Sequence, residues 1–459
     1  MHERARDRPC CRAMGLPLAT ALLGLVLANG RLAAYVVGPR VRRPAAMSAD
    51  QQGKSKDGPT DADDTPPPLE NQLSLFASLR ARQVVIDQAV HRRWREGQVS
   101  TRVPITLNDW VRRLALDWPL AACGTARGGL VIVDLDAGTM LACAQTAHPG
   151  VVSTPEVARD MRLLNGDYDG NGVLAVAMLG DRVVSAGREG GVRVWKLVGD
   201  EILHESDLKT DVLASALLLP DSEEGPLWGA FLDGSLRKWT HLASCESTGE
   251  EPSIVISCGA PVLSAACCPA LGVIAAATEK GTVELFDMED GAPCGEWKPL
   301  AFDGSKGFKG ARARAVNFLQ DETTGVWNLF VGGSDGSIHR RALLRPIINH
   351  TNASDVTSGT GVSLFDDCVT KLLPSHQGSV VTLTPGPCGL LVSGAHDGTL
   401  RIWDVVDEEK PTCLYGFGGY KVWLGSVCTD GRRLVSDGSD NSLVLHDFSA
   451  DAVMDDEHT

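Results

Sequence analysis

Three residues in the last quarter of the chain, His376, Ser393 and Asp397, have the side-chain types that activate a hydroxyl nucleophile through a general base and an orienting carboxylate. Ser393 lies inside the apolar run 390–394, which indicates a buried strand, and Asp397 precedes Gly398 at a tight turn. The sequence has no phosphate-binding loop and no HExxH motif. These positions favour a buried polar network that links strands. We therefore predict that these residues are not catalytic and that the chain is not an enzyme.

A second candidate is the segment 167–178, which begins like a calcium-binding loop. Such a loop needs oxygen ligands at its first, third and fifth positions, and Asp167, Asp169 and Asn171 supply them. The ninth position is Ala175, and the twelfth, where a bidentate glutamate belongs, is Met178. We interpret the segment as a polar turn that leads into a strand, and we expect no metal.

The cysteines give no sign of a metal centre or a disulfide framework. The chain has 13 cysteines and no Cys-x-x-Cys pair. The adjacent pair Cys267 and Cys268 lies in the apolar run 262–270, which reads as a buried strand. We expect reduced, buried thiols and no cofactor.

The elements that position these residues repeat along the chain. Each repeat is a turn, in most cases with glycine, followed by a segment of alternating apolar residues. The seven units are Arg127–Val133, Glu189–Trp195, Asp233–Trp239, Lys280–Phe286, Asp335–Arg341, Asp397–Trp403 and Asp440–His446. Glycine supplies the positive φ that a two-residue turn requires. Seven units predict seven four-stranded sheets packed radially, which is an all-β propeller.

This pattern resembles the WD40 repeat family over residues 101–449. The sixth unit carries the fullest match to the hydrogen-bonded tetrad of that family, and the matching residues are His376, Ser393, Asp397 and Trp403. Arg341 and His446 stand where the fifth and seventh units would have tryptophan. The resemblance implies a seven-bladed WD40 β-propeller in which the tetrad has a structural role.

The same resemblance implies a function and a binding face. Propellers of this family hold other proteins, and the residue before each turn lies on the face where the loops converge. Those residues here are Arg188, Leu232, Glu279, Ser334, His396 and Ser439, with Tyr420, Lys421 and Trp423 at the rim of the seventh blade. We predict a non-catalytic scaffold for protein partners, with ordinary solvated loops as the alternative.

The N-terminal region has the composition of a targeting sequence. Residues 1–34 combine arginines, the apolar stretch Leu16–Ala28 and small residues in the layout of a signal peptide. The apolar stretch is too short to span a bilayer, which needs about 20 residues. Residues 35–49 are basic and contain no acidic residue, as in a transit peptide. The tandem resembles the bipartite presequence of algae with secondary plastids, so we predict delivery to a plastid.

Two alternatives to plastid delivery remain open. Translation from Met47 would give a cytoplasmic protein, and secretion would make the glycosylation sequons at Asn349 and Asn352 relevant. Recovery of native protein that begins at Met1 would contradict the targeting prediction.

Three further segments flank the repeats. Residues 50–68 read as a disordered linker and residues 450–459 as an acidic tail. Residues 69–100 have apolar residues at helical spacing and predict an amphipathic helical segment. Its end, Arg93–Gly97, resembles the Trp-x-x-Gly linker of F-box/WD40 proteins, which gives a ubiquitin-ligase substrate receptor as the alternative function. The F-box itself does not appear in the sequence.

The seventh repeat lacks a fourth strand, because the residues after it are acidic. We predict that Val103–Leu107 crosses over to pair with the segment Leu443–Phe448 and closes the ring, with Pro104 tolerated at an edge.

The charge distribution narrows the class of partner. The net charge is −15, and residues 1–49 carry +6, so the remaining residues carry −21. An acidic body repels phosphate backbones. We expect protein partners, no nucleic acid, no membrane span in the mature chain and a monomeric propeller.

Overall fold

The computed structural model describes residues 69–149, 172–219, 225–240, 250–300, 310–343, 365–407, 410–420, 424–438 and 440–449. Within these ranges the chain forms one α-helix, α1 (Leu69–Glu96), the short 3-10 helix η1 (Pro269–Leu271), and 28 strands. The predicted targeting segments, linker, acidic tail and calcium-loop residues Asp167, Asp169 and Asn171 lie outside the described residues and stay predictions.

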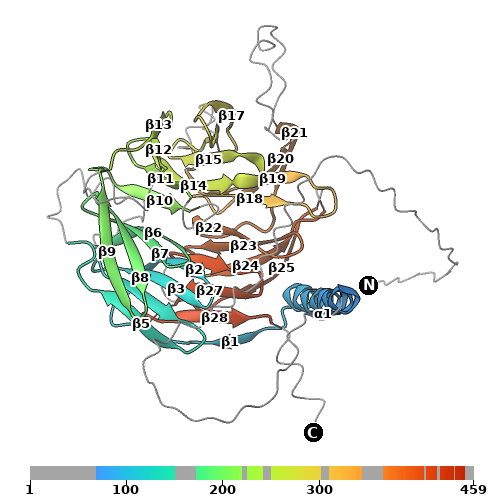
Figure 1. Ribbon diagram of the computed structural model, residues 1–459. Helices are drawn as coiled ribbons and strands as arrows, with labels where there is room; N and C mark the ends of the chain where they lie inside the picture. Colours follow the sequence, from blue (N-terminus) through green and yellow to red (C-terminus); the bar gives the residue numbers. More distant parts are fainter. Residues whose placement is uncertain are drawn as a thin grey trace, which may run out of the picture. The chain divides into compact units, whose positions relative to one another are not determined.

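The strands form seven four-stranded antiparallel sheets, which are the blades of a propeller (Figure 1). Blades one and two are β2 (Val111–Asp117), β3 (Leu120–Thr125), β4 (Leu130–Asp134) and β5 (Thr139–Ala144), then β6 (Val173–Leu179), β7 (Arg182–Gly187), β8 (Val192–Val198) and β9 (Glu201–Leu208). Blades three and four are β10 (Ala214–Leu218), β11 (Leu227–Phe231), β12 (Ser235–Trp239) and β13 (Ile254–Ser257), then β14 (Val262–Cys268), β15 (Val273–Thr278), β16 (Val283–Asp287) and β17 (Pro293–Trp297).

Blades five and six are β18 (Ala313–Gln320), β19 (Trp327–Gly333), β20 (Ile338–Leu343) and β21 (Phe365–Lys371), then β22 (Val380–Pro385), β23 (Leu390–Ala395), β24 (Leu400–Asp404) and β25 (Thr412–Phe417). Blade seven is β26 (Val427–Thr429), β27 (Arg433–Asp437), β28 (Leu443–Asp447) and, from the other end of the chain, β1 (Ser100–Arg102). The predicted all-β, seven-bladed fold is confirmed.

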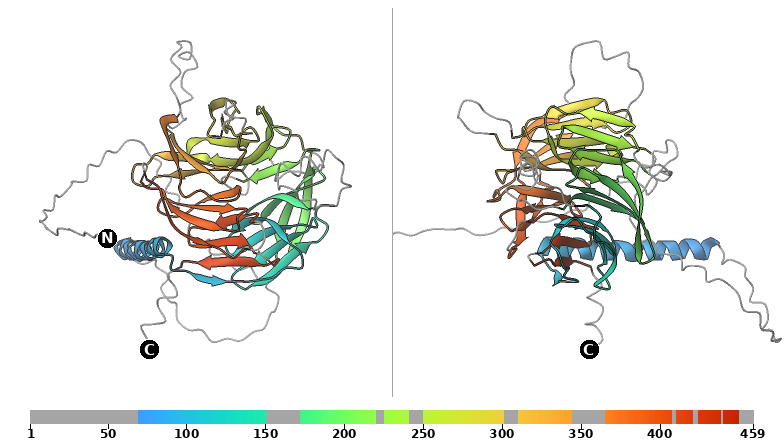
Figure 2. Two further views of the ribbon diagram at one scale, coloured as in Figure 1. Left: turned by 180° about the vertical axis from the view of Figure 1, so that it is seen from behind. Right: turned by 90° about the vertical axis from the view of Figure 1, so that its left-hand side faces the viewer.

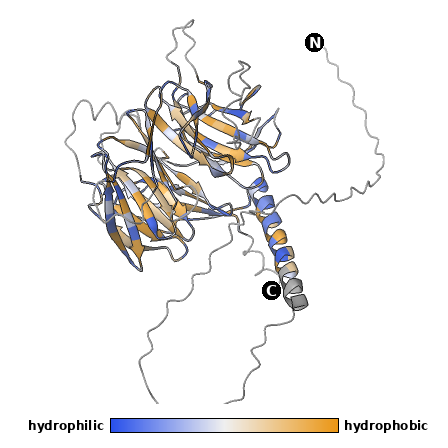
Figure 3. Cartoon of the chain, turned by 45° about the horizontal axis from the view of Figure 1, so that its top comes forward, coloured by the Kyte–Doolittle hydropathy of each residue, from blue (hydrophilic) through white to orange (hydrophobic). Residues whose placement is uncertain are grey.

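The inner strands of the blades form a closed ring. Each inner strand contacts the inner strand of the next blade, and β26 of blade seven contacts β2 of blade one. The blades are apolar on both faces because each face packs against a neighbour. Val273 and Leu285 of blade four, for example, share a buried cluster with Leu329 and Val331 of blade five. Figure 3 shows this hydrophobic colouring within the blades.

The glycine turns between the second and third strands lie at one end of the propeller, which we call the turn face. Its turn glycines are Gly128, Gly190, Gly234, Gly281, Gly336 and Gly398. Gly398 has a φ of 72°, and a Cβ there would lie 2.5 Å from the carbonyl oxygen of Tyr420. A Cβ on Gly336 would lie 2.1 Å from the carbonyl oxygen of His376. These turns therefore require glycine both for their φ and because the chain entering the next blade passes directly over them.

The ring closes through β1, which pairs with β28. Ser100 is opposite Asp447 and Thr101 is opposite His446, and Figure 1 shows the two strands side by side. The predicted closure is therefore confirmed, but the regular strand lies earlier than the predicted Val103–Leu107. That segment keeps only an isolated bridge, from Thr106 to Ser442. The interruption falls at Pro104, which has no N–H to donate to the ladder.

The C-terminal half of α1 packs against blades six and seven, on the side opposite the turn face. Val90 and Trp94 are buried there. The Trp94 ring stacks on Phe448 at a centroid distance of 3.9 Å, and its Nε1 donates to the carbonyl oxygen of Gly431 at 3.1 Å. Figure 2 shows the N-terminal half of α1 projecting past the propeller. The described part of the chain contains no helix long and apolar enough to cross a membrane.

Candidate functional site

The predicted tetrad of blade six is a hydrogen-bonded network. His376 Nε2 lies 2.7 Å from Ser393 Oγ, and Trp403 Nε1 donates to the same oxygen at 2.8 Å. His376 Nδ1 lies 3.0 Å from Asp397 Oδ2. Ser393 and Trp403 have no exposed surface. The serine hydroxyl is enclosed and bonded to two partners, so it is placed to join strands and not to attack a substrate.

The electrostatics of the tetrad agree with this role. Burial lowers the pKa of His376, although the carboxylate of Asp397 opposes that shift. The pKa of Asp397 is held below its ordinary value: burial opposes this, but hydrogen bonds from Thr399, Gln377 and His376 outweigh it. A neutral imidazole and an ionised carboxylate at neutral pH give a stable donor–acceptor pair.

Blade two contains a second network of the same form, which sequence reasoning missed. His148 Nε2 lies 2.7 Å from Ser185 Oγ, Trp195 Nε1 donates to Ser185 Oγ at 2.8 Å, and His148 Nδ1 lies 2.6 Å from Glu189 Oε1. The serine, acid and tryptophan have the same spacing as Ser393, Asp397 and Trp403. This shared spacing could have identified the blade-two network from the sequence. His148 could not be assigned to this network from the sequence, because residues 149–171 separate it from the strands of blade two.

Blade seven carries a modified network. The Tyr420 hydroxyl lies 2.9 Å from Ser436 Oγ and 3.3 Å from His446 Nε2, and His446 Nδ1 lies 2.8 Å from Thr101 Oγ1. His446 thus replaces the tryptophan and Tyr420 replaces the histidine. Tyr420 was predicted to lie at the rim of blade seven, on the protein-binding face. Instead its hydroxyl binds inside the blade, and burial raises its pKa.

The other predicted face residues separate into three groups. Arg188 and Leu232 are buried, at 2% and 7% exposure, so they offer little surface to a partner, and their place on a protein-binding face stays a prediction. Leu232 packs in a cluster with Leu174, Leu213 and Leu263, because its turn lies against the neighbouring inner strands. Glu279 and His396 are partly exposed and Ser334 is exposed. Ser439, Lys421 and Trp423 lie outside the described residues.

Ser334 also belongs to a Gly-x-Ser-x-Gly pattern, at residues 332–336, of the kind found at nucleophile elbows. Here the pattern spans the end of β19 and the turn to β20, so strand is followed by strand and not by helix. Ser334 Oγ accepts a hydrogen bond from the backbone N–H of Arg312 at 2.9 Å. The pattern is a propeller turn. Among the described residues, no group of three or more His, Cys, Asp or Glu side chains could hold a metal ion.

An exposed aromatic residue on the turn face was also missed. Trp110 precedes β2 and is 45% exposed. Its carbonyl oxygen accepts from Ala126 N–H, and Asp109 Oδ2 accepts from Arg127 N–H at 2.7 Å, which places Trp110 beside the turn of blade one. The Arg112 guanidinium lies 5.0 Å from its ring centroid. The sequence pattern does not show that Trp110 is exposed, because exposure at a strand end depends on the neighbouring loops.

The helix end that resembles an F-box linker has a packing role. The Trp94 ring stacks on Phe448. Arg93 donates a hydrogen bond to the carbonyl oxygen of Ser449, and Arg95 forms an ion pair with Asp404. These contacts account for the Trp-x-x-Gly likeness without a ubiquitin-ligase role.

The seven four-stranded blades define a β-propeller built from sequence repeats. Blades two, six and seven each contain a serine-centred hydrogen-bond network. The family model "WD domain, G-beta repeat" matches residues 367–404, most of blade six. The chain is therefore a seven-bladed β-propeller in which one WD40 repeat is matched by the family model.

Comparisons with known proteins give partial likenesses. "Nuclear distribution protein PAC1-2" of Uncinocarpus reesii is 42% identical over 81 residues, which is 17% of this chain and 16% of that protein. "Ribosome biogenesis protein YTM1" of Candida albicans is 24% identical over 297 residues, 58% of this chain and 60% of that protein. The chain thus spans less than two thirds of either relative. The crystal structure of the computationally designed Ika8 protein aligns with 75% of this chain and 99% of that one, with a TM-score of 0.45 and 17% identity.

Proposed function

We propose that this propeller is a non-catalytic scaffold that binds a protein partner on its turn face, with Trp110 at the centre of the contact. The observation that carries the proposal is the large aromatic ring left 45% exposed beside an arginine. Tryptophan and arginine are the residues most enriched where binding energy concentrates in protein interfaces.

Two features support the choice of this face. The serine-centred networks of blades two and six use their hydroxyl and imidazole groups in hydrogen bonds within the propeller, which supports a structural role for them. The opposite side of blades six and seven is already covered by α1. The two relatives named above are called ribosome biogenesis and nuclear distribution proteins, and neither name specifies a chemical reaction.

The test compares two tagged variants of the full chain by affinity purification and mass spectrometry. Trp110→Ala should lose the partners that the wild type retains, by at least about tenfold in recovered abundance, because a loss of about 2 kcal/mol at a central aromatic weakens binding about thirtyfold. Met140→Ala is the matched control, since Met140 is 55% exposed on the outer strand β5, away from the turn face. If both variants retained the same partners, the binding face proposed here would be wrong.

A further inference from the structure

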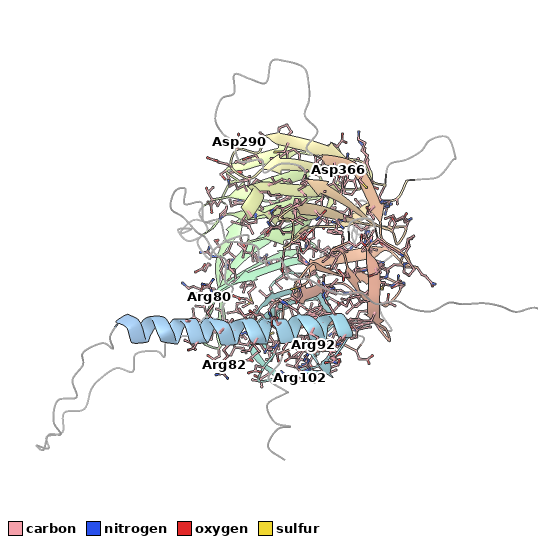
Figure 4. The ribbon with its side chains drawn as sticks, turned by 90° about the vertical axis from the view of Figure 1, so that its right-hand side faces the viewer. Arg80, Arg82, Arg92, Arg102, Asp290 and Asp366 are labelled. Atoms are coloured by element: carbon pink, nitrogen blue, oxygen red, sulfur yellow. The ribbon has the colours of Figure 1, made fainter. Side chains whose placement is uncertain are left out.

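The N-terminal half of α1 extends past the propeller (Figure 2). Every residue in the segment 77–85 is exposed, whereas Val90 and Trp94, further along the same helix, are buried in a cluster with blades six and seven. We call residues 77–85 the projecting segment. Figure 4 shows Arg80 and Arg82 on it and Arg92 nearer the C-terminal end of the helix. A short helix that packs against nothing is only marginally stable in water, so a partner that covers this segment would stabilise it.

Large apolar side chains lie on several sides of the projecting segment. Leu79, Val84 and Val85 are 53%, 48% and 65% exposed. Because each residue turns a helix by about 100°, Val84 lies about 140° and Val85 about 240° from Leu79 around the axis. Leu79 is on the same side as Val90, and so it continues the face that packs on the propeller. A partner that covers all three exposed side chains must therefore surround the helix.

The projecting segment is positively charged, although the chain as a whole is acidic. Within residues 71–86 the only charged side chains are those of Arg80 and Arg82. The carboxylate that follows them on the helix, Asp87, forms an ion pair with Arg432 of blade seven at 3.2 Å. This carboxylate therefore faces the propeller. Carboxylates on a partner would complement the two arginines through charge-assisted hydrogen bonds.

Two other kinds of partner fit these features less well. A lipid surface binds a helix whose apolar side chains lie on one face, with the charged side chains on the opposite face. Here the exposed apolar side chains lie on three sides. A second copy of this chain would bring Arg80 and Arg82 close to the same two arginines, with no carboxylate in the segment to pair with them. A different protein that surrounds the helix avoids both problems.

We propose that the projecting segment is the docking site of a second protein, whose apolar groove is bordered by carboxylates and closes around the helix. Leu79 and the two valines fill the groove, and Arg80 and Arg82 pair with the carboxylates at its border. The docked half of α1 holds the projecting segment in helical form and away from the blades. This site lies on α1 and not on the turn face, so it is independent of the contact proposed at Trp110.

The experiment uses calmodulin as the probe. Calcium opens a methionine-rich apolar groove in calmodulin, and this groove binds basic amphipathic helices. Isothermal titration calorimetry of the full chain with calcium-loaded calmodulin should give a Kd in the micromolar range or lower. The same titration with the chelator EGTA in place of calcium should show no binding, because the groove is then closed.

Variants of the full chain locate the contact. Leu79→Ala should weaken binding about tenfold, because it removes an apolar anchor while alanine maintains the helix. The double variant Arg80→Gln and Arg82→Gln should weaken binding about fivefold, and lysine at both positions should restore most of the affinity because the charge returns. Val255→Ala is the matched control. Val255 is 60% exposed on β13 of blade three, away from α1, and its replacement should change the Kd by less than about twofold.

Each outcome decides the inference. It would be overturned if the wild type did not bind calmodulin in the presence of calcium, if Leu79→Ala bound as tightly as the wild type, or if Val255→Ala lost as much affinity. Sedimentation of the wild type with phosphatidylserine vesicles that is lost in Leu79→Ala would assign the projecting segment to a membrane instead. A wild-type dimer in light scattering that becomes a monomer in Leu79→Ala would assign the segment to a second copy of this chain. Either result would also overturn the inference.

Discussion

At the scale of single residues, one serine hydroxyl organises each complete network. Ser393 Oγ contacts both a histidine and a tryptophan, and Ser185 Oγ does the same in blade two. Buried polar groups cost free energy unless they are paired, so the pattern is stable only when all of its members are present. Replacing the serine removes the shared partner of two buried groups.

Ser393→Ala should therefore lower the free energy of unfolding by about 1–3 kcal/mol, the cost of leaving a buried donor unpaired. Ser185→Ala should have an effect of similar size. Urea denaturation followed by tryptophan fluorescence measures both. Ser253→Ala is the control, because its hydroxyl donates to the carbonyl oxygen of Lys238 at an exposed site, and it should stay within about 0.5 kcal/mol of the wild type. A Ser393→Ala protein as stable as the control would contradict the structural role of the network.

The residues of the blade-six network could be read from the sequence because they lie close along the chain. His148 could not, because its distance from Ser185 reflects a long connection whose length no local rule fixes.

At the scale of elements, strands and turns followed from local chemistry, whereas bulges and packing partners did not. The alternating apolar runs and turn glycines locate the strands. The bulges at Arg112 and Arg314 depend on how each inner strand meets its neighbours. The helix of 69–96 was expected from its spacing, but its contact with blades six and seven depends on the distant Phe448 and Gly431.

That contact gives a prediction for α1. Trp94→Ala should lower the free energy of unfolding by about 3–5 kcal/mol, since it removes a fully buried ring that stacks on Phe448. Val85→Ala lies on the same helix with 65% exposure and should change stability by less than about 0.5 kcal/mol. Thermal unfolding followed by circular dichroism compares the two. Equal melting temperatures would show that α1 does not stabilise the propeller.

At the scale of the whole molecule, the number of blades and the closure of the ring could be predicted from the sequence, whereas the distribution of charge on the surface could not. Seven turn units gave seven blades, and the missing last strand pointed to the segment before β2. The net charge of −15 gives no information on where positive and negative side chains lie on the surface. Figure 4 shows Arg80, Arg82 and Arg92 along α1, with Asp290 and Asp366 near the far end of the propeller.

Buried titratable groups give the folded molecule a defined response to pH. Burial lowers the pKa of His446 to about 4, and burial with nearby arginines does the same for His396. As the pH falls below 6.5, the ordinary pKa of histidine, these two side chains bind protons in the unfolded chain. In the folded chain they stay neutral until about pH 4, so the free energy of unfolding falls across this window. Burial raises the pKa of Asp437 to about 6, which acts in the opposite direction between about pH 6 and 4.

Because the histidines outnumber this carboxyl group, acidification from pH 7 to pH 5 should lower the free energy of unfolding. His446→Gln should reduce the difference in the free energy of unfolding between pH 7 and pH 5, and Asp437→Asn should increase that difference. Urea denaturation at both pH values tests the signs. A His446→Gln protein with the full pH dependence of the wild type would contradict the assignment.

The pairing of β1 with β28 also determines how the propeller carries mechanical load. The strands are antiparallel, and Ser100, where β1 begins, lies opposite Asp447, where β28 ends. A force that pulls the two ends of the propeller apart therefore acts at one fork and would break the ladder one hydrogen bond at a time. Trp94 on Phe448 and Arg93 on Ser449 connect the two chains just beyond that fork. The contacts of α1 must therefore break before the force separates β1 from β28 in the seventh blade.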